Sequence, residues 1–273
     1  MIPEKVSVIL STYNRPKALF IVLSCLCLQD DDNFEIIVAD DGSEAPTREV
    51  VENVRNTFPN RTIRHVWQEN KGFRLARIRN LAVKEAAGDY LVFLDGDCVP
   101  PPDFISNHRR LAEIGWTVYG QRILASQAYT TSLEFAPTPL FSPEFWSFIN
   151  FFTLFVQRRV NRAFPAIAIT GNDWRKRKPY CWEKIRGCNW AMWLKDYIAI
   201  NGSDESFEGW GAEDKDVAVR LINSGIRIKE GRNKSYVLHL WHPLANRDRN
   251  TIQSDIVFNR LSKKIVYPLK GLL

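Results

Sequence analysis

The chain has 273 residues, of which 45% are hydrophobic and 25% are charged, and its formal net charge is +6. This is an ordinary globular composition with enough apolar material for a sizeable core, and the length allows one large domain or two small ones. The positive excess suits an anionic ligand, a nucleic acid or an anionic membrane surface, and it does not choose among them.

The cysteines and the apolar segments narrow the class of protein further. Five cysteines without a CxxC pair exclude a zinc cluster and a disulfide framework, and they favour reduced thiols in a cytosolic protein. The N-terminal apolar run is too short for a signal peptide, and no stretch approaches the roughly 20 apolar residues of a transmembrane helix. We therefore expect a cytoplasmic protein, soluble or bound peripherally at the inner membrane.

The first half of the chain alternates between expected strands and expected helices. Strands are predicted at residues 6–12, 34–39, 61–68 and 90–94, and helices at 17–28, 47–57 and 74–87. This alternation implies right-handed crossovers and an α/β fold with a doubly wound, mostly parallel sheet. Ligands bind such sheets beyond the carboxyl ends of the strands. Three polar clusters follow strands at that edge: Thr12-Tyr13-Asn14-Arg15, Asp40-Asp41 and Asp95-Gly96-Asp97.

The last of these clusters is a candidate metal site. Asp95 and Asp97 flank Gly96 directly after an apolar strand. Two carboxylates on a tight turn can bind a hard divalent cation such as Mg²⁺ or Mn²⁺, which keeps a substrate phosphate in its coordination shell. A lone DxD is more often a solvated acidic turn, but the buried strand before it and the polar clusters at the same edge favour the metal site.

The alternation weakens after about residue 115. Residues 141–156 are dense in aromatic side chains and run into Arg158, Arg159 and Arg162. Such a segment is typical of helices that bind at an anionic membrane surface. An internal helix with a solvated basic end explains the sequence at least as well. The basic C-terminal segment has the same interfacial character.

No repeat or low-complexity linker divides the chain, so one domain with two lobes is expected. The divisions are a first lobe at 1–120 that carries the three polar clusters, a second lobe at 121–245 and a basic C-terminal tail at 246–273.

Four segments of the first half form an ordered set: VSVILSTYNRP, IIVADDGS, ENKGFRLARIRNLA and GDYLVFLDGD. Together they resemble the inverting glycosyltransferase family two, which has the GT-A fold. The later segment GCNWAMWLKDYIAINGSDESFEGWGAEDKDVAVRLINSG is similar to the C-terminal region shared by β-1,4-galactosyltransferases, chondroitin-polymerising enzymes and polypeptide N-acetylgalactosaminyltransferases. The matches span about residues 5–242, and the ordered set is specific although any one piece alone is weak.

The resemblance implies that residues 1–120 form a nucleotide-sugar-binding lobe with the donor site and that residues 121–245 form an acceptor-binding and catalytic lobe. The matching residues belong to the loop that meets the base and diphosphate (Thr12, Tyr13, Arg15), to the acid that accepts a hydrogen bond from the base (Asp40), and to the segment that closes over the donor (Lys71, Gly72, Arg79). That base is usually uracil in the family, so UDP is the favoured nucleotide.

The resemblance also implies a site for Mn²⁺ or Mg²⁺. Asp97 is the expected direct ligand, and Asp95 either joins it or holds ribose or a metal-bound water. His239 follows an apolar run and matches the family's third metal ligand, with His242 as the alternative. A lone histidine on a strand is usually structural, so this assignment depends on its position downstream of the acidic motif.

The catalytic base is expected in the GWGAED segment. In the related galactosyltransferases this motif carries the base, and Asp214 occupies its position. Glu213 points elsewhere on any regular element and is expected to bind a hydroxyl of donor or acceptor. Trp210 can offer its ring face to the acceptor sugar, and core packing explains it about equally well. Ala212 stands where the family often has glycine, and its methyl group could narrow the acceptor side.

Acidic residues also suit the first turn of a helix running to about residue 223, because their negative charge interacts favourably with the helix dipole. That explains the acidity of the segment and leaves the preceding glycines and tryptophan unexplained.

These residues predict an inverting, metal-dependent transfer of a hexose or N-acetylhexosamine to a saccharide hydroxyl. A carboxylate would deprotonate the acceptor, while the metal and cationic side chains would stabilise the leaving nucleoside diphosphate. The acceptor is expected to be a saccharide or lipid-linked saccharide of bacterial surface polysaccharide or lipopolysaccharide synthesis.

Two alternatives share the acidic site. A nucleotidyltransferase would not need the GWGAED segment, and a non-catalytic nucleotide- or carbohydrate-binding module would be expected to lose the base or a metal ligand. Nucleic acid is not expected as a partner, because the basic residues are scattered and no nucleic-acid-binding motif occurs.

Overall fold

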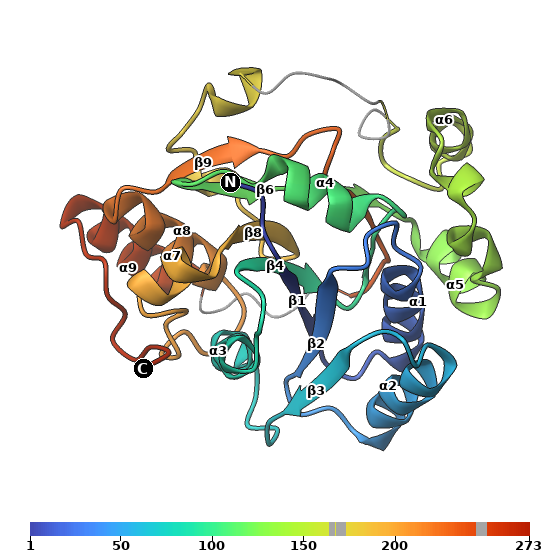
Figure 1. Ribbon diagram of the computed structural model, residues 1–273, viewed down its shortest axis with the longest axis horizontal. Helices are drawn as coiled ribbons and strands as arrows, with labels where there is room; N and C mark the ends of the chain where they lie inside the picture. The colour runs from blue at the N-terminus through green and yellow to red at the C-terminus, as the bar shows by residue number, and fades with distance from the viewer. Residues whose placement is uncertain (164–166, 168–172, 244–249) are drawn as a thin grey trace.

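The computed structural model describes residues 1–163, 167, 173–243 and 250–273 (Figure 1). Parts of the expected acceptor lobe (164–166, 168–172 and 244–245) and the start of the expected tail (246–249) lie outside the described residues.

One seven-stranded sheet runs through both expected lobes in the order β3-β2-β1-β4-β8-β6-β9. Its strands are β1 (Val6–Thr12), β2 (Phe34–Asp40), β3 (Ile63–Trp67), β4 (Tyr90–Asp95), β6 (Trp116–Tyr119), β8 (Asn189–Trp193) and β9 (Arg227–Glu230). The first four pair in parallel, β8 is antiparallel to both β4 and β6, and β9 is parallel to β6. The expectation of a mostly parallel α/β sheet is confirmed.

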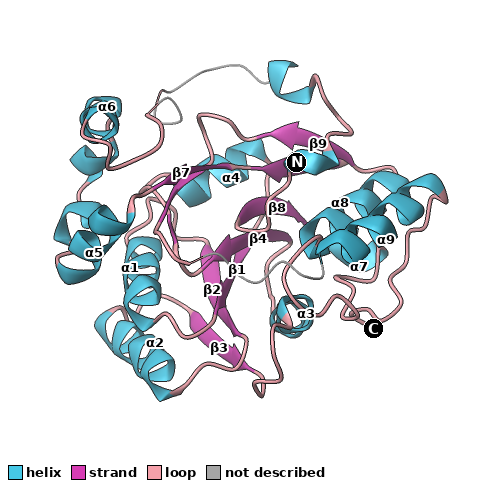
Figure 2. Cartoon of the chain, turned by 180° about the vertical axis from the view of Figure 1, so that it is seen from behind, coloured by secondary structure: helices cyan, strands magenta, loops and turns pink. Residues whose placement is uncertain are grey.

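Helices cover both faces of this sheet (Figures 1 and 2). On one face lie α1 (Pro16–Cys27), α2 (Ala45–Thr57) and α4 (Phe104–Leu111), which pack against the even-numbered side chains of β1 and β2. On the other lie α3 (Leu75–Lys84), α7 (Leu194–Ala199), α8 (Glu213–Asn223) and α9 (Asn250–Ser262), which pack against the odd-numbered ones. Buried Val, Ile and Leu fill β1, β2 and β4 because these strands are covered on both sides.

The strand register brings the polar clusters to one edge. Thr12 at the end of β1 pairs with Asp40 of β2, and the preceding Ser11 pairs with Asp95 of β4. The chain then turns at Gly96, whose N–H donates to the Ser11 carbonyl over 2.7 Å. A Cβ atom at Gly96 would lie only 3.0 Å from that carbonyl oxygen, so the turn needs a glycine to stay this close to β1.

A second, three-stranded sheet adds a histidine to the same edge. Its order is β5 (Cys98–Val99), β10 (Tyr236–His239) and β7 (Gln121–Leu124). His239 pairs with Cys98, which directly follows the Asp95–Asp97 turn. Residues more than 140 positions apart in the sequence therefore meet at one point.

Residues 250–273 belong to the domain and do not form a free basic tail. Helix α9 packs on α8, and Leu272 is buried near the C-terminus. Arg260 of α9 forms buried ion pairs with Asp204 and with Asp216 of α8. The positive charge of this segment is therefore partly used inside the protein.

The aromatic stretch forms a separate projection. After α5 (Gln127–Phe135) and the short 3₁₀ helix η1 (Thr138–Phe141), it forms a second 3₁₀ helix, η2 (Pro143–Trp146), and α6 (Phe148–Val156). Both views place α5 and α6 at one side of the molecule, away from α8 and α9 (Figures 1 and 2). Across the described residues, none of the helices combines the length and the apolar character that crossing a membrane requires.

Candidate active site

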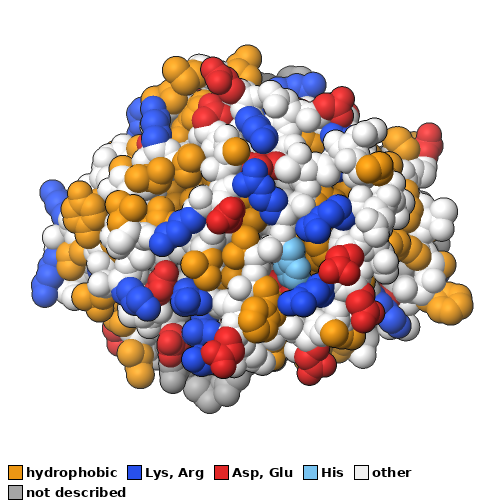
Figure 3. Space-filling model, turned by 60° about the horizontal axis from the view of Figure 1, so that its bottom comes forward, with side chains coloured by type: hydrophobic (Ala, Val, Ile, Leu, Met, Phe, Trp, Pro, Cys, Tyr) orange, Lys and Arg blue, Asp and Glu red, His pale blue; other side chains and the backbone are white. Residues whose placement is uncertain are grey.

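A cavity of about 1060 Å³ lies at the carboxyl edge of the sheet. This edge faces the viewer in Figure 3, where Lys and Arg side chains gather around a histidine. The cavity receives side chains from both halves of the chain. Of the residues expected from the sequence, it is lined by Thr12, Tyr13, Arg15, Arg79, Asp95, Asp97, Trp210, Glu213, Asp214 and His239.

One wall of the cavity carries a potential metal site. Asp97, His239 and His242 each present a ligand atom, and these atoms lie within 4.8 Å of one another. Nε2 of His239 is 3.7 Å from Oδ1 of Asp97, and Nε2 of His242 is 3.5 Å from Oδ2. Burial lowers the pKa of His239, which favours the neutral imidazole that binds metals. The carboxylate is a ligand that suits Mn²⁺ and Mg²⁺, and the two imidazoles favour a transition-metal cation, so of the two expected cations the donor set fits Mn²⁺ better.

Both histidines considered for the third ligand position lie in this cluster. His239 and His242 both converge on Asp97, whereas the sequence interpretation treated them as competitors. Asp95, which was expected to join them, is not part of the cluster. Its carboxylate instead accepts a hydrogen bond from Arg79 over 3.1 Å.

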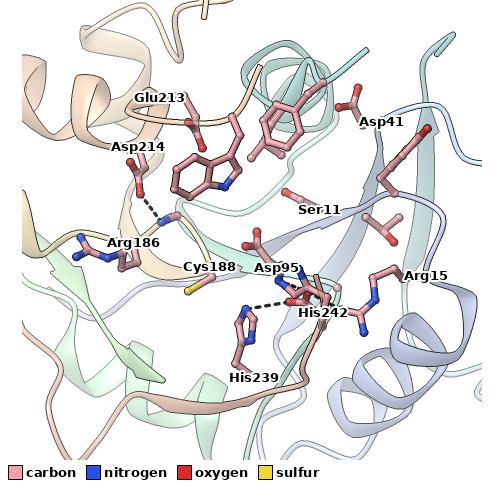
Figure 4. Close-up of a pocket in the computed structure, with 18 of the residues that line it drawn as sticks. Ser11, Arg15, Asp41, Asp95, Arg186, Cys188, Glu213, Asp214, His239 and His242 are labelled. Carbon is pink, nitrogen blue, oxygen red and sulfur yellow. Dashed lines mark hydrogen bonds and ion pairs between the residues drawn. The ribbon is translucent and has the colours of Figure 1, made fainter. Parts of the chain in front are cut away.

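Arg15 stands beside the metal site. Its Nη1 is 2.8 Å from Oδ2 of Asp97, and its Nη2 is 3.4 Å from Glu134 of α5. The guanidinium is partly exposed to the cavity, where it can meet a diphosphate bidentately. In Figure 4, Arg15, His239 and His242 lie together on the side of the cavity opposite Glu213 and Asp214.

Arg79 is buried beneath the cavity and joins its two sides. Its guanidinium donates to Ser11, to Asp95 and to the carbonyl of Gly187. A Cβ atom at Gly187 would lie 2.8 Å from Nη1 of Arg79, so the close contact needs glycine there. The resemblance assigned Arg79 to the donor phosphates. Its hydrogen bonds instead hold Asp95 and the backbone of residue 187 in place.

The acidic pair lies at the start of α8. Asp214 accepts hydrogen bonds from the N–H of Gly187 at 2.8 Å and of Lys215 at 2.7 Å, which fix its carboxylate at the cavity wall. Glu213 accepts from the N–H of Gly211 at 3.1 Å. The two side chains point in different directions, as expected (Figure 4).

Burial shapes the ionisation of this region. Burial, together with the negative charge of Asp214, raises the pKa of Glu213 to about 7. Burial also raises the pKa of Asp95 to about 6, against the opposing effect of Arg79. Each carboxylate therefore accepts a proton more readily than usual. A cationic ligand or a hydroxyl donor would stabilise the ionised form and so offset the free-energy cost of burying its charge.

The residue before this pair explains the glycine preference of the related enzymes. Ala212 has a φ of +60°, in the left-handed region where a side chain is strained. Its methyl group is buried, with 4% of the residue exposed. The residue belongs to the apolar core near α8 and also lines the cavity.

Asp40 does not reach the cavity. It continues the alternation of Ile36 and Val38, whose side chains pack toward α1 and α2, so its carboxylate turns away from the pocket. It accepts from the N–H of Ser43 at 2.8 Å and contacts Nε2 of His65 at 2.9 Å. The assignment of Asp40 to the nucleotide base is therefore not supported by the geometry.

The next residue is the acid of this turn that reaches the cavity. Asp41 lines the cavity and accepts hydrogen bonds from Gln68 and from the N–H of Arg74, the latter at 2.8 Å. The doublet of acids was visible in the sequence. Strand alternation beyond Ala39 was the signal that could have chosen between its two members.

The loop before α3 gives a second correction. Lys71 is exposed and pairs with Glu69 at 2.8 Å, and neither Lys71 nor Gly72 lines the cavity. Phe73 lines it instead and offers an apolar surface near Tyr13 and Asp41. Trp210 also lines the cavity, with 36% of the residue exposed, which agrees with a sugar-facing position.

Sequence reasoning missed several other lining residues. They are Ser11, Asp41, Phe73, Arg122, Arg186, Gly187, Cys188, Lys215 and Trp241. Arg122, Arg186 and Lys215 add positive charge, which suits a polyanionic ligand. The motifs assigned no role to these three side chains, and they come from three separate elements: β7, the loop before β8 and α8.

The fold and this cavity define the class of protein. The structure superposes with a TM-score of 0.61 on a Staphylococcus aureus TarS fragment (residues 1–349) solved with UDP, at 17% identity, covering 95% of this chain and 65% of that one. It superposes with a TM-score of 0.59 on a mannosyltransferase from Pyrobaculum calidifontis solved with GDP-Man and Mn²⁺, at 17% identity, covering 96% and 71%. The fold is that of GT-A glycosyltransferases.

The chain belongs to the family described as glycosyl transferase family 2, which matches residues 7–169. A second family, described as the N-terminal domain of galactosyltransferase, matches residues 168–243. Membership of this family favours a glycosyltransferase domain over the nucleotidyltransferase alternative.

Curated relatives extend the match over most of the chain. A chondroitin synthase of Escherichia coli is 28% identical over 238 residues, which are 82% of this chain and 33% of that protein. A validoxylamine A glucosyltransferase of Streptomyces hygroscopicus subsp. jinggangensis is 28% identical over 244 residues, covering 83% and 53%. The chain thus spans a third to a half of the length of these relatives.

Proposed function

We propose that this glycosyltransferase moves a hexose or N-acetylhexosamine from a nucleotide diphosphate sugar, with UDP favoured, to a saccharide hydroxyl by an inverting, metal-dependent reaction. One observation carries the proposal. The cavity holds a carboxylate with two imidazoles on one side and a fixed carboxylate, Asp214, on the other. In an inverting transfer, the cation must lie beside the leaving nucleoside diphosphate and the base must lie beside the attacking hydroxyl. These two positions are on opposite sides of the transferred sugar.

The donor would lie along the carboxyl edge of the sheet. Asp41, Phe73 and Tyr13 surround one end of the cavity and suit a planar base, through a hydrogen bond and ring contacts. Arg15 lies between this end and the metal ligands, where its fork suits the diphosphate. A bound Mn²⁺ or Mg²⁺, held by Asp97, His239 and His242, would neutralise charge on the diphosphate as the sugar leaves.

Asp214 would take the proton of the acceptor hydroxyl. Two backbone N–H groups hold its carboxylate in one orientation, so little freedom is lost when the acceptor arrives. Arg79 supports this position indirectly, because it holds the carbonyl of the residue whose N–H contacts Asp214. Glu213 and Trp210 remain for sugar hydroxyls and a sugar ring face.

The relatives support a saccharide acceptor. Among them are proteins named chondroitin synthase and hyaluronan synthase, the latter from Pasteurella multocida and 28% identical over 243 residues. We infer from these names that the acceptor is a growing or lipid-linked saccharide, as in bacterial surface polysaccharide or lipopolysaccharide synthesis. The inference concerns the class of acceptor alone.

A thermal-shift screen tests the donor half of the proposal. The full chain would be melted with UDP-, GDP-, ADP- and dTDP-linked sugars, each with and without Mn²⁺. We expect one nucleotide class to raise the melting temperature, and to do so more strongly with Mn²⁺. If no nucleotide sugar stabilises the protein under either condition, the proposed donor site is wrong.

A further inference from the structure

The outer face of α6 is apolar and faces solvent. Ile149 is 78% exposed, Phe152 is 51% exposed and Val156 is 65% exposed. These residues stand at i, i+3 and i+7, so they form one stripe along the helix. Phe155, 44% exposed, widens the stripe, and Phe135 at the end of α5 is 91% exposed.

The inner face of the same helix is buried against the rest of the domain. Phe151 and Leu154 are buried, and the ring of Phe151 packs against Phe145, Trp146 and Tyr236 at centroid distances of 5.7 to 6.2 Å. The inner face therefore anchors the helix to the domain. The outward stripe is a separate apolar surface and is not part of an incompletely packed core. Exposed apolar surface of this extent usually marks an interaction site.

The charged residues beside the stripe indicate which kind of surface it binds. Arg158, Arg159 and Arg162 follow α6 directly, and all three are exposed. Residues 136–163 contain these three arginines and a single acid, Glu144. Arg159 is held in place by the ring of Tyr129, 5.3 Å from its guanidinium carbon. An apolar stripe with arginines at its end matches the boundary between lipid head groups and acyl chains of an anionic bilayer.

A second copy of the chain fits this surface less well. In a symmetric dimer the same patch meets itself, so the arginines of each copy would face a segment that carries a single acid, Glu144. An anionic membrane pairs with the same charges favourably. With nine residues, α6 is too short to cross a bilayer and suits a position in the head-group layer.

We propose that the α6 face, defined by Ile149, Phe152, Phe155, Val156 and the adjacent Arg158 and Arg162, docks the enzyme on the surface of an anionic membrane. This surface is joined to the active site through α5. That helix ends in the exposed Phe135, and the preceding Glu134 pairs with Arg15, which pairs with Asp97. Membrane docking would thus hold the active site near acceptors carried on lipids, and this benefit rests on the proposed function. The docking itself does not depend on that function.

Vesicle flotation with the full chain tests the docking. Two vesicle preparations would be used, one of phosphatidylcholine and one of phosphatidylcholine with phosphatidylglycerol. Ile149→Ser with Phe152→Ser would remove the apolar contact, and Arg158→Glu with Arg162→Glu would remove the charge contact. Ile198→Ser, at a 42% exposed position of α7, and Arg55→Glu on α2 are matched controls elsewhere on the surface.

We expect the native chain and both controls to float with the anionic vesicles and much less with the neutral ones. Each double substitution should lower the partition by at least about tenfold, since apolar insertion and charge both contribute. No binding of the native chain, or binding that neither double substitution weakens, would overturn the proposal. Self-association that is lost in Ile149→Ser with Phe152→Ser, without vesicle binding, would assign the face to a second copy and also overturn it.

Nucleoside diphosphate release from the donor separates this test from that of the proposed function. Release should be equal in the native chain and in the Ile149→Ser, Phe152→Ser variant when no vesicles are present. Vesicle binding without any donor turnover would refute the proposed function alone. Donor turnover without vesicle binding would refute the docking alone.

Discussion

Replacement of Asp214 by Asn tests the assignment of the catalytic base. The carboxylate accepts from two N–H groups, at 2.8 and 2.7 Å. An asparagine keeps one acceptor oxygen and turns its NH₂ toward the other N–H, so one hydrogen bond is lost. That costs about 1 kcal/mol of stability, or roughly 2–4 °C in melting temperature for a domain of this size. The fold should therefore survive the change.

The effect on catalysis should be much larger. A positioned general base contributes roughly 10²- to 10⁴-fold, so kcat of Asp214→Asn should fall by that factor. Nucleotide binding should change little, because Asp214 lies across the cavity from Arg15, His239 and His242 (Figure 4).

The assay is nucleoside diphosphate release in the presence of acceptor, with nucleotide affinity measured separately by calorimetry. Asp32→Asn is the matched control, since that side chain is 92% exposed and far from the cavity. Turnover of Asp214→Asn equal to that of the control would refute the base assignment. Loss of nucleotide affinity in parallel with turnover would place Asp214 in donor binding instead.

Two further predictions concern stability. Burial lowers the pKa of His108 from 6.5 to about 4, so the folded state resists protonation, and about 3 kcal/mol of stability should be lost as the pH falls from 6.5 to 4. Denaturant unfolding across this range should show a shallower loss for His108→Gln, and equal slopes would contradict the shift. Arg260→Met removes the buried cationic partner of Asp204 and leaves Asp216 with Arg220 alone, and it should cost about 3–5 kcal/mol of unfolding free energy. A cost below about 1 kcal/mol in urea titration would show that the α9 ion pairs do not stabilise the domain.

The first half of the fold could be predicted because its signals are local. The strands at residues 6–12 and 90–94 are continuous apolar runs that end in polar turns, and the structure has β1 and β4 at these positions. The helix predicted at 74–87 is shorter, since α3 begins at Leu75 and ends at Lys84. Such differences arise because helix ends depend on contacts beyond the local pattern.

Side-chain direction at the cavity was harder to predict. The sequence places Asp40 and Asp41 in the same turn, and only the pleat of β2 shows that Asp41 faces the cavity while Asp40 meets His65. Likewise, the distance between Asp97 and the two histidines depends on the pairing of β5 with β10. A motif identifies the residue types, and the strand pairing decides which of them meet.

Long-range support was not visible in the sequence at all. Gly187 contacts Asp214 from 27 positions away, and Arg79 contacts Gly187 from a distance of 108 positions. The basic C-terminal segment gave no sign that Arg260 would be used for buried ion pairs. Composition marks it as a tail, because charge alone does not reveal partners that lie elsewhere in the chain.

The central claim is that a divalent cation at Asp97, His239 and His242 helps to bind a nucleoside diphosphate. Calorimetric titration of UDP, or of the diphosphate of the donor that the screen identifies, tests it most directly. The titration would be run on metal-free protein and with Mn²⁺, for the native chain, for Asp97→Ala and for Asp103→Ala as an exposed control outside the cavity. We expect Mn²⁺ to strengthen binding at least about tenfold, or 1.4 kcal/mol, in the native chain and the control, and to have no such effect in Asp97→Ala. Equal affinity with and without Mn²⁺ in the native chain would contradict the account.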